Sequence, residues 1–168
     1  MSDAILLAQG KAMQGWARVE SHLMFLFAYL LPTEPGDIRA TALPLVLYQA
    51  IRGAEARHRV LAAVARHQLM GTALEADWKA LNDSIVEARK RRNGIAHWTI
   101  YSDKGQIFAS QDPLTIDDEG DIKPFSRRSS AADIERMADD FISLSSQVEA
   151  FRRQVADLLQ PGSSPKTG

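Results

Sequence analysis

The chain has 168 residues, of which 45% are hydrophobic and 24% are charged, and its formal net charge is −1. This length allows one domain with a core of its own, and the near-neutral charge excludes a protein-wide basic field that would attract nucleic acid. The absence of cysteine excludes disulfides and thiolate chemistry, and it agrees with the cytoplasmic location that we expect.

The N-terminal sequence lacks the charged-then-apolar pattern of a signal peptide. The longest apolar run, residues 23–31, is far too short to span a bilayer. We therefore expect no association with a membrane.

The first predicted helix begins at Ser2 or Asp3 and ends near Leu31, because prolines follow. The carboxylate of Glu20 lies on its apolar stripe. Glu20 is either a carboxylate at the rim of the core or the partner of an inward-facing arginine, for which Arg92 is the candidate. The stripe consists of Trp16, Glu20, Leu23, Phe27 and Leu30.

Two helices are predicted next. A short one covers Asp37 to about Leu43, and Pro44 begins another, because proline is tolerated in a first turn. The second helix covers 45–69, and His58 on its stripe is interpreted as a core residue. A break is expected at 70–72, where a glycine precedes a threonine cap. The stripe consists of Leu47, Ile51, Ala54, His58, Leu61, Ala65 and Gln68.

The fourth predicted helix starts near Thr72 and has an arginine on its apolar stripe. A guanidinium is costly to bury unless an anion meets it. Either a carboxylate inside the protein pairs with Arg92, or this helix face opens onto a site. The stripe consists of Leu74, Trp78, Leu81, Ile85, Ala88, Arg92 and Ile95.

An insertion of approximately residues 98–126 follows. One strand is predicted over 98–101 and a second over 106–109, with a turn between them. Ile116 and Ile122 flank the acidic residues 117–121 in what is predicted as a second small hairpin.

The last predicted helix begins at Ser130 with Asp133 and ends at Pro161. Its stripe continues without a break, which is typical of a helix packed lengthwise on other helices or on a second copy of the chain. The fold class predicted is mainly α, a four- or five-helix bundle with a small β-hairpin insertion, in a single domain over 1–160 with a flexible tail over 161–168. The stripe consists of Ile134, Met137, Phe141, Leu144, Val148, Phe151, Val155 and Leu158.

The sequence excludes several kinds of site. Its glycines form no phosphate loop, its four histidines lack the spacing of a zinc site, and no serine lies in the small-residue elbow of a hydrolase.

The motif that remains is Arg92-Asn93 followed by His97. This arrangement resembles the HEPN motif, which Arg92, Asn93 and His97 match residue by residue, and the frame of residues 4–101 resembles small bacterial proteins of that family.

The resemblance implies a function. HEPN proteins are often metal-independent ribonucleases that act as dimers, with the motifs of both chains in one cleft, and many belong to toxin–antitoxin, abortive-infection or CRISPR-linked systems. It implies a homodimer with an RNA substrate, an antitoxin or defence partner, no cofactor and no metal. Arg92, His97 and Asn93 would be catalytic, and Glu20 would support them.

The chemistry is consistent with this interpretation. An imidazole with an ordinary pKa of ~6.5 can accept or donate a proton near neutrality, and a guanidinium stabilises a phosphorane, so that RNA would yield a 2′,3′-cyclic phosphate. Asn93 would orient His97 or hold a phosphate oxygen. The residues expected to contact RNA are Arg89, Lys90, Arg91, Trp98 and Tyr101.

Geometry adds a condition. At ~100° per residue, Arg92 and His97 are roughly 140° apart on an unbroken helix. Either the helix breaks at Gly94, or a second subunit supplies the complementary residue.

The chain departs from the family at one position, and an alternative function remains. HEPN toxins that are silenced by modification have a tyrosine two positions after the histidine, whereas this chain has Thr99 there and its tyrosine at Tyr101. The chain is alternatively a non-catalytic helical binding or dimerisation module in which Arg92 pairs with Glu20 and His97 interacts with the helix dipole.

Overall fold

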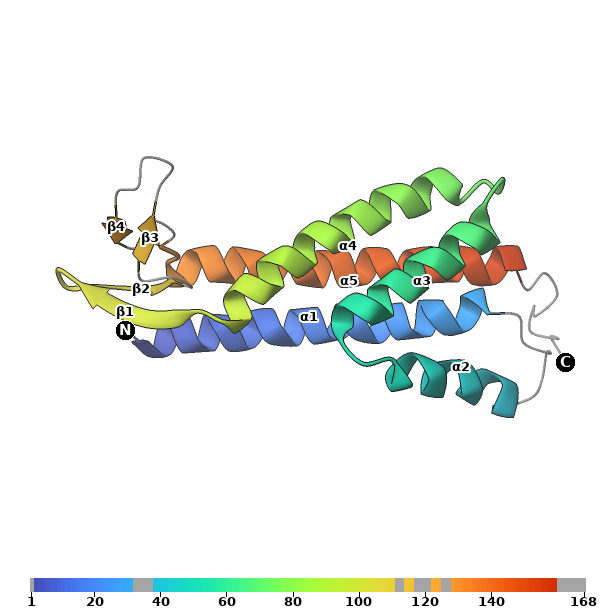
Figure 1. Ribbon diagram of the computed structural model, residues 1–168, viewed down its shortest axis with the longest axis horizontal. Helices are drawn as coiled ribbons and strands as arrows, with labels where there is room; N and C mark the ends of the chain where they lie inside the picture. The colour runs from blue at the N-terminus through green and yellow to red at the C-terminus, as the bar shows by residue number, and fades with distance from the viewer. Residues whose placement is uncertain (1, 32–37, 111–113, 117–121, 125–127, 160–168) are drawn as a thin grey trace, which may run out of the picture. The chain divides into compact units, whose positions relative to one another are not determined.

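The computed structural model describes residues 2–31, 38–110, 114–116, 122–124 and 128–159. They form five helices with a small antiparallel hairpin between the fourth helix and the last, which confirms the predicted mainly α fold (Figure 1). Within these residues, no helix is both long enough and apolar enough to cross a membrane. The predicted tail over 161–168 lies outside the described residues.

The chain divides into two compact units. The hairpin unit consists of residues 1–18 and 86–143, and the α2–α3 unit consists of residues 19–85 and 144–168. Three helices contribute residues to both units, namely α1 (Ser2–Leu30), α4 (Glu75–Ala96) and α5 (Ala131–Leu159). Each unit has its own core and is described by itself, and the predicted single domain stays a prediction.

The core of the hairpin unit is formed where α1 packs on α5. The indole of Trp16 meets the ring of Phe141 edge-on, with 5.6 Å between the ring centroids. Gly15 allows the close approach, because a Cβ placed there would lie 3.2 Å from the Ala138 carbonyl oxygen and 3.2 Å from the Phe141 Cβ. The other buried residues of this core include Ile5, Ala8, Ala12, Ala88, Ile95, Phe108, Ala109, Ile134 and Ala138.

The predicted hairpin is present. Strand β1 (Thr99–Asp103) pairs with β2 (Gln106–Ser110), and the two-residue turn has positive φ at Lys104 (49°) and Gly105 (79°), which fits the right-handed twist of the strands. A backbone bridge between Ala109 and Ser129 connects β2 to the segment before α5.

A second hairpin follows the first. It pairs β3 (Leu114–Ile116) with β4 (Ile122–Pro124), with Ile116 opposite Ile122 as the sequence predicted.

Helix α5 begins at the predicted cap. The backbone N–H of Asp133 donates to Ser130 Oγ at 3.2 Å, and the Asp133 carboxylate accepts from the Ser130 N–H at 2.8 Å and from its hydroxyl at 2.7 Å. These hydrogen bonds lower the pKa of Asp133, the hydroxyl contributing most. The apolar stripe that follows is buried at Ile134 and from Phe141 to Val155, whereas Met137 is half-buried and Leu158 is 39% exposed.

The predictions for residues 37–69 were wrong in one respect. Helix α2 (Ile38–Ala50) contains Pro44 in its interior, so the proline does not begin a new helix. The break lies instead at 51–53, where Gly53 adopts a φ of 86°, and α3 covers Ala54–Leu69. A proline removes a single intrahelical donor, whereas a left-handed glycine ends the helical path.

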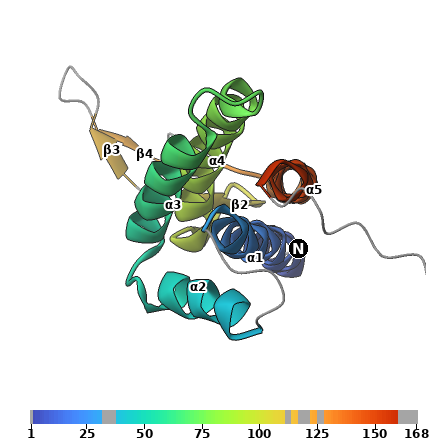
Figure 2. The ribbon, with the colours of Figure 1, turned by 90° about the vertical axis from the view of Figure 1, so that its right-hand side faces the viewer.

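The α2–α3 unit packs these helices on α1. Figure 2 shows α2 beside α1, where the Phe27 and Tyr48 rings lie 5.2 Å apart. His58 is buried, as expected of a core histidine, whereas Leu47 is 48% exposed because the predicted stripe crossed the break. Gly71 has a φ of 75° past the end of α3, and Thr72 Oγ1 accepts the Leu74 N–H at 3.2 Å, so the predicted break at 70–72 is confirmed.

Candidate functional site

The candidate motif lies on the last turns of α4 in the hairpin unit. Ala88 and Ile95 on the apolar stripe are each 2% exposed, and Arg92 between them is half-buried. The helix continues through Gly94 to Ala96, so the first of the two alternatives, a break at Gly94, does not occur. A single glycine costs a helix only about 1 kcal/mol, which the buried neighbours of Gly94 offset.

The end of α4 is a tight turn. The His97 N–H donates to the Gly94 carbonyl oxygen at 3.0 Å, and the Trp98 N–H donates to the Ile95 carbonyl oxygen at 3.3 Å. Such bonds across three residues satisfy carbonyl groups that would otherwise lack partners at a helix end. His97 is therefore the first residue beyond the helix, and its side chain is exposed to solvent.

The guanidinium of Arg92 is only partly satisfied. Its Nη1 donates to Oδ1 of Asn93 at 3.2 Å, whereas its Nε is buried and has no hydrogen-bond partner among the described residues. A buried donor without a partner costs free energy of about 1–3 kcal/mol, which an acceptor that reached it would recover. The arginine thus combines a fixed backbone position with unused hydrogen-bonding capacity.

Asn93 is exposed and holds the arginine through its carbonyl oxygen. Its amide nitrogen remains as the donor of this side chain. This contact places Asn93 next to Arg92, whereas the prediction that Asn93 orients His97 has no contact to support it.

Glu20, the predicted partner of Arg92, belongs to the α2–α3 unit, where it is half-exposed. Burial raises the pKa of Tyr48 to about 12, against the opposing charge of Arg57, and the Glu20 carboxylate adds to the rise. Glu20 is thus close enough to Tyr48 to disfavour its ionisation. The Glu20–Arg92 pair stays a prediction.

The basic residues before the motif are engaged in ion pairs at the surface. Lys90 pairs with Glu87 at 3.3 Å, and Arg91 pairs with Asp140 of α5 at 2.8 Å. Such exposed pairs contribute about 0–1 kcal/mol, so either cation can exchange its carboxylate for a phosphate. The sequence did not indicate a role for Asp140, because this residue lies 49 positions from Arg91 and only the fold brings the two together. Arg89 is half-buried.

The aromatic residues expected to contact RNA lie after the motif, and Trp98 and Tyr101 are both half-buried. The Tyr101 ring stacks on Phe108 at 6.1 Å, and the Arg128 guanidinium lies 4.5 Å from the Phe108 ring centroid. Sequence reasoning missed Phe108 and Arg128, although the register of the hairpin places Phe108 opposite Tyr101. The contact with Phe108 limits the ring area that Tyr101 offers to a base.

Within the described part of the chain, no three His, Cys, Asp or Glu side chains form a group that could hold a metal ion. The side chains at the motif carry a guanidinium, an amide and an imidazole. Residues five positions apart on an ideal helix point about 140° apart, and His97 here lies one residue past the end of α4.

Comparison of the chain with protein-family models, with curated proteins and with solved structures gave no match. The resemblance to HEPN proteins consequently depends on the three motif residues and on their position at the end of α4.

Proposed function

We propose that this protein is a metal-independent endoribonuclease of a toxin or phage-defence type, acting in the cytoplasm as a homodimer. The observation that carries the proposal is the Arg92 side chain. It occupies an apolar stripe, retains a buried Nε without a hydrogen-bond partner in the described chain, and precedes an exposed histidine by five positions. A purely structural arginine at such a position would be expected to have its donors satisfied.

The proposed reaction is an internal transesterification. The 2′-oxygen attacks the adjacent phosphorus, and its proton passes to His97 acting as general base. The bond from phosphorus to the 5′-oxygen breaks, that oxygen takes a proton from water, and the imidazolium of His97 then returns its proton to the solvent. The products are a 2′,3′-cyclic phosphate and a 5′-hydroxyl. Arg92 donates to the phosphorane oxygens as their negative charge develops, which an Nε in a partly desolvated position does more strongly than in water.

The end of α4 supports the homodimer. Since Arg92 lies on α4 and His97 is the first residue past its end, we propose that Arg92 of one protomer and His97 of its partner act on the same phosphate. A twofold axis would generate two such composite sites. It would also bring together two copies of Arg89, Lys90 and Arg91, which supplies the local positive potential that the net charge of −1 does not.

An RNA cleavage assay in EDTA tests the proposal. We expect His97→Ala and Arg92→Ala each to lower the cleavage rate by at least about a hundredfold, because each removes one group from the transition state. His67→Ala, at an exposed histidine of α3, and Arg59→Ala, at an exposed arginine of the same helix, are the matched controls and should cleave normally. Cleavage that persists in either motif variant would contradict the proposal.

A non-catalytic helical module is the second candidate. It is favoured by the angular separation of Arg92 and His97 and by the hydrogen bond that already ties Arg92 to Asn93. In that case the protein would bind an antitoxin or another defence-system partner, and wild-type protein would cleave no RNA at any concentration. The same assay therefore separates the two candidates.

A further inference from the structure

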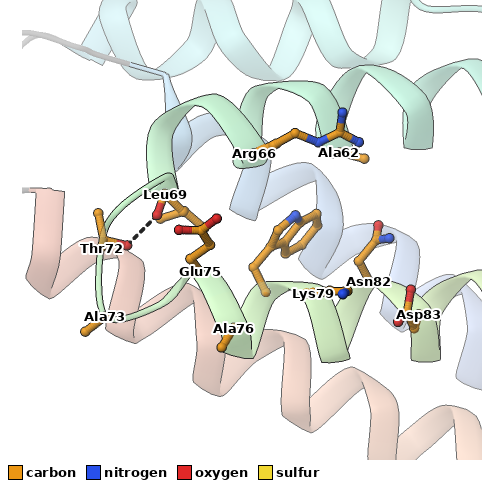
Figure 3. A pocket seen from close by; sticks show the side chains of 11 residues that line it. Ala62, Arg66, Leu69, Thr72, Ala73, Glu75, Ala76, Lys79, Asn82 and Asp83 are labelled. Atoms are coloured by element: carbon orange, nitrogen blue, oxygen red, sulfur yellow. Dashed lines mark hydrogen bonds between the residues drawn. The ribbon is translucent and has the colours of Figure 1, made fainter.

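A cavity of about 720 Å³ opens between α3 and α4 in the α2–α3 unit. Figure 3 shows its labelled side chains projecting from the last turns of α3, from the connecting turn and from the first turns of α4. Its volume is in the range of pockets that hold small organic molecules. The proposed ribonuclease motif belongs to the other unit, so the cavity is a feature that the proposed function does not use.

Small residues create the cavity. Ala62 of α3, Ala73 of the connecting turn and Ala76 of α4 line it where larger side chains would fill the space between the helices. The apolar lining also includes Leu69 and the indole of Trp78, which are 0% and 6% exposed. A cavity lined by alanine, leucine and tryptophan favours a flat apolar ring.

One polar atom in this lining lacks a partner. Oδ1 of Asn82 is buried and accepts no hydrogen bond from any described residue. Figure 3 shows this oxygen directed from α4 toward α3. Leaving a buried carbonyl oxygen unpaired costs free energy, which an N–H donor that reaches this oxygen from the cavity would recover.

Charges at the cavity balance each other. Arg66 and Lys79 are basic, whereas Glu75 and Asp83 are acidic, and all four are exposed. The Glu75 carboxylate already accepts the backbone N–H of Gly71 at 2.7 Å. With two charges of each sign, the cavity offers no net attraction to a multiply charged anion, in contrast to a typical phosphate site.

We propose that this cavity binds a small, uncharged, flat heteroaromatic compound whose ring N–H donates a hydrogen bond to Oδ1 of Asn82. The ring occupies the space bounded by the alanines and Trp78. The donor satisfies the amide oxygen, and the balanced charges leave an uncharged compound without an electrostatic penalty.

Indole and 1-methylindole form a matched pair of probes, because they share the same flat ring and only indole has the N–H. We expect indole added to the ¹⁵N-labelled full chain to shift the Asn82 side-chain amide signals saturably, the signals being assigned by their loss in Asn82→Leu. We expect 1-methylindole to bind at least about tenfold more weakly, because it leaves the amide oxygen unpaired. Equal affinities for the two probes, or no saturable shift with indole, would overturn the proposal.

Two further variants separate binding from folding. Ala76→Phe fills the cavity, whereas Ala80→Phe places the same side chain on the same helix at a residue outside the lining, and both alanines are exposed. Indole should raise the melting temperature of the wild type and of Ala80→Phe but not that of Ala76→Phe. Asn82→Leu should melt no lower than wild type, because it removes an unpaired polar group, while losing the response to indole. A response to indole that persists in Ala76→Phe would show that the compound binds elsewhere.

Discussion

Arg92 donates a hydrogen bond to Asn93, the next residue in the chain, and leaves its own Nε buried without a partner in the described part of the structure. Consecutive residues on a helix point about 100° apart, so the contact depends on the long arginine side chain bending toward the short amide. The amide thereby fixes one edge of the guanidinium while the other edge keeps its donor. This arrangement is suited to binding an anionic oxygen, and it is the basis of the first two predictions.

Mixed dimers test whether the two catalytic groups come from different protomers. Arg92→Ala and His97→Ala proteins are each expected to be inactive alone. When the two are unfolded together and refolded at equal amounts, about half of the dimers are mixed, and each mixed dimer has one intact composite site, so activity should recover to about a quarter of the wild-type value. Recovery would be absent if both groups came from the same protomer. Mixing Arg92→Ala with Arg92→Ala,His97→Ala is the control and should give no activity.

A double-mutant cycle tests the structural role of Glu20. If Glu20 and Arg92 form an ion pair, the free energies of unfolding of Glu20→Gln, Arg92→Gln and the double variant should be non-additive by about 0.5–3 kcal/mol. If Arg92 is held for catalysis, we expect additivity within about 0.5 kcal/mol. Urea unfolding followed by circular dichroism provides the measurement. Strong coupling together with absent RNA cleavage would favour the non-catalytic module.

The cap of α5 should make stability depend on acid pH. Hydrogen bonds from Ser130 lower the pKa of Asp133 in the folded protein, so its charged form is favoured by folding. The resulting stability is present above the unfolded pKa of ~3.9 and is lost as the pH falls through the lowered folded value. Asp133→Asn should therefore lose stability at pH 7 but little at pH 3.

Exposure limits the size of this effect, because the Asp133 side chain is 37% exposed. Asp139→Asn, at an exposed aspartate of the same helix, is the control and should show no comparable difference between the two pH values. Melting temperatures measured across this range would detect the change. A constant deficit of Asp133→Asn at both pH values would show that the carboxylate charge is not the cause.

Two glycines of α1 should respond oppositely to larger side chains. A Cβ at Gly10 meets nothing within 4 Å, so Gly10→Ala should stabilise the protein by about 0.5–1 kcal/mol through helix propensity alone. At Gly15 a Cβ would press on Ala138 and Phe141 at 3.2 Å, so Gly15→Val should destabilise by about 1–3 kcal/mol. Thermal unfolding of the two variants checks the contrast. Equal tolerance at both positions would mean that α1 and α5 do not pack closely at Gly15.

Regular periodicity explains which elements were predictable. The stripe of α5 follows steps of three and four, and every residue along it from Ile134 to Val155 except Met137 proves buried, because only one face of a helix can contact the core. The cap at Ser130 and Asp133 was equally predictable, since the two residues interact locally along the chain. The turn at Lys104 and Gly105 follows from the preference for positive φ in a two-residue hairpin.

The errors arose where periodicity competes with backbone geometry. Pro44 was expected to begin a helix, yet the helix passes through it, and Gly53 causes the break that the stripe had concealed. At the candidate site, the pattern placed Arg92 on the apolar face, but the Arg91–Asp140 pair depends on a contact between elements, as does the burial of the Asn82 oxygen in the other unit. No local pattern contains such contacts.

Helix α4 continues without a break through Gly94, so the number of residues between Arg92 and His97 determines where the His97 side chain lies. One alanine inserted after Gly94 would rotate the imidazole about the helix axis by ~100° and move it along the axis by ~1.5 Å. Four inserted residues would nearly restore its original direction. Residue count, as much as residue identity, thus sets where this imidazole can reach.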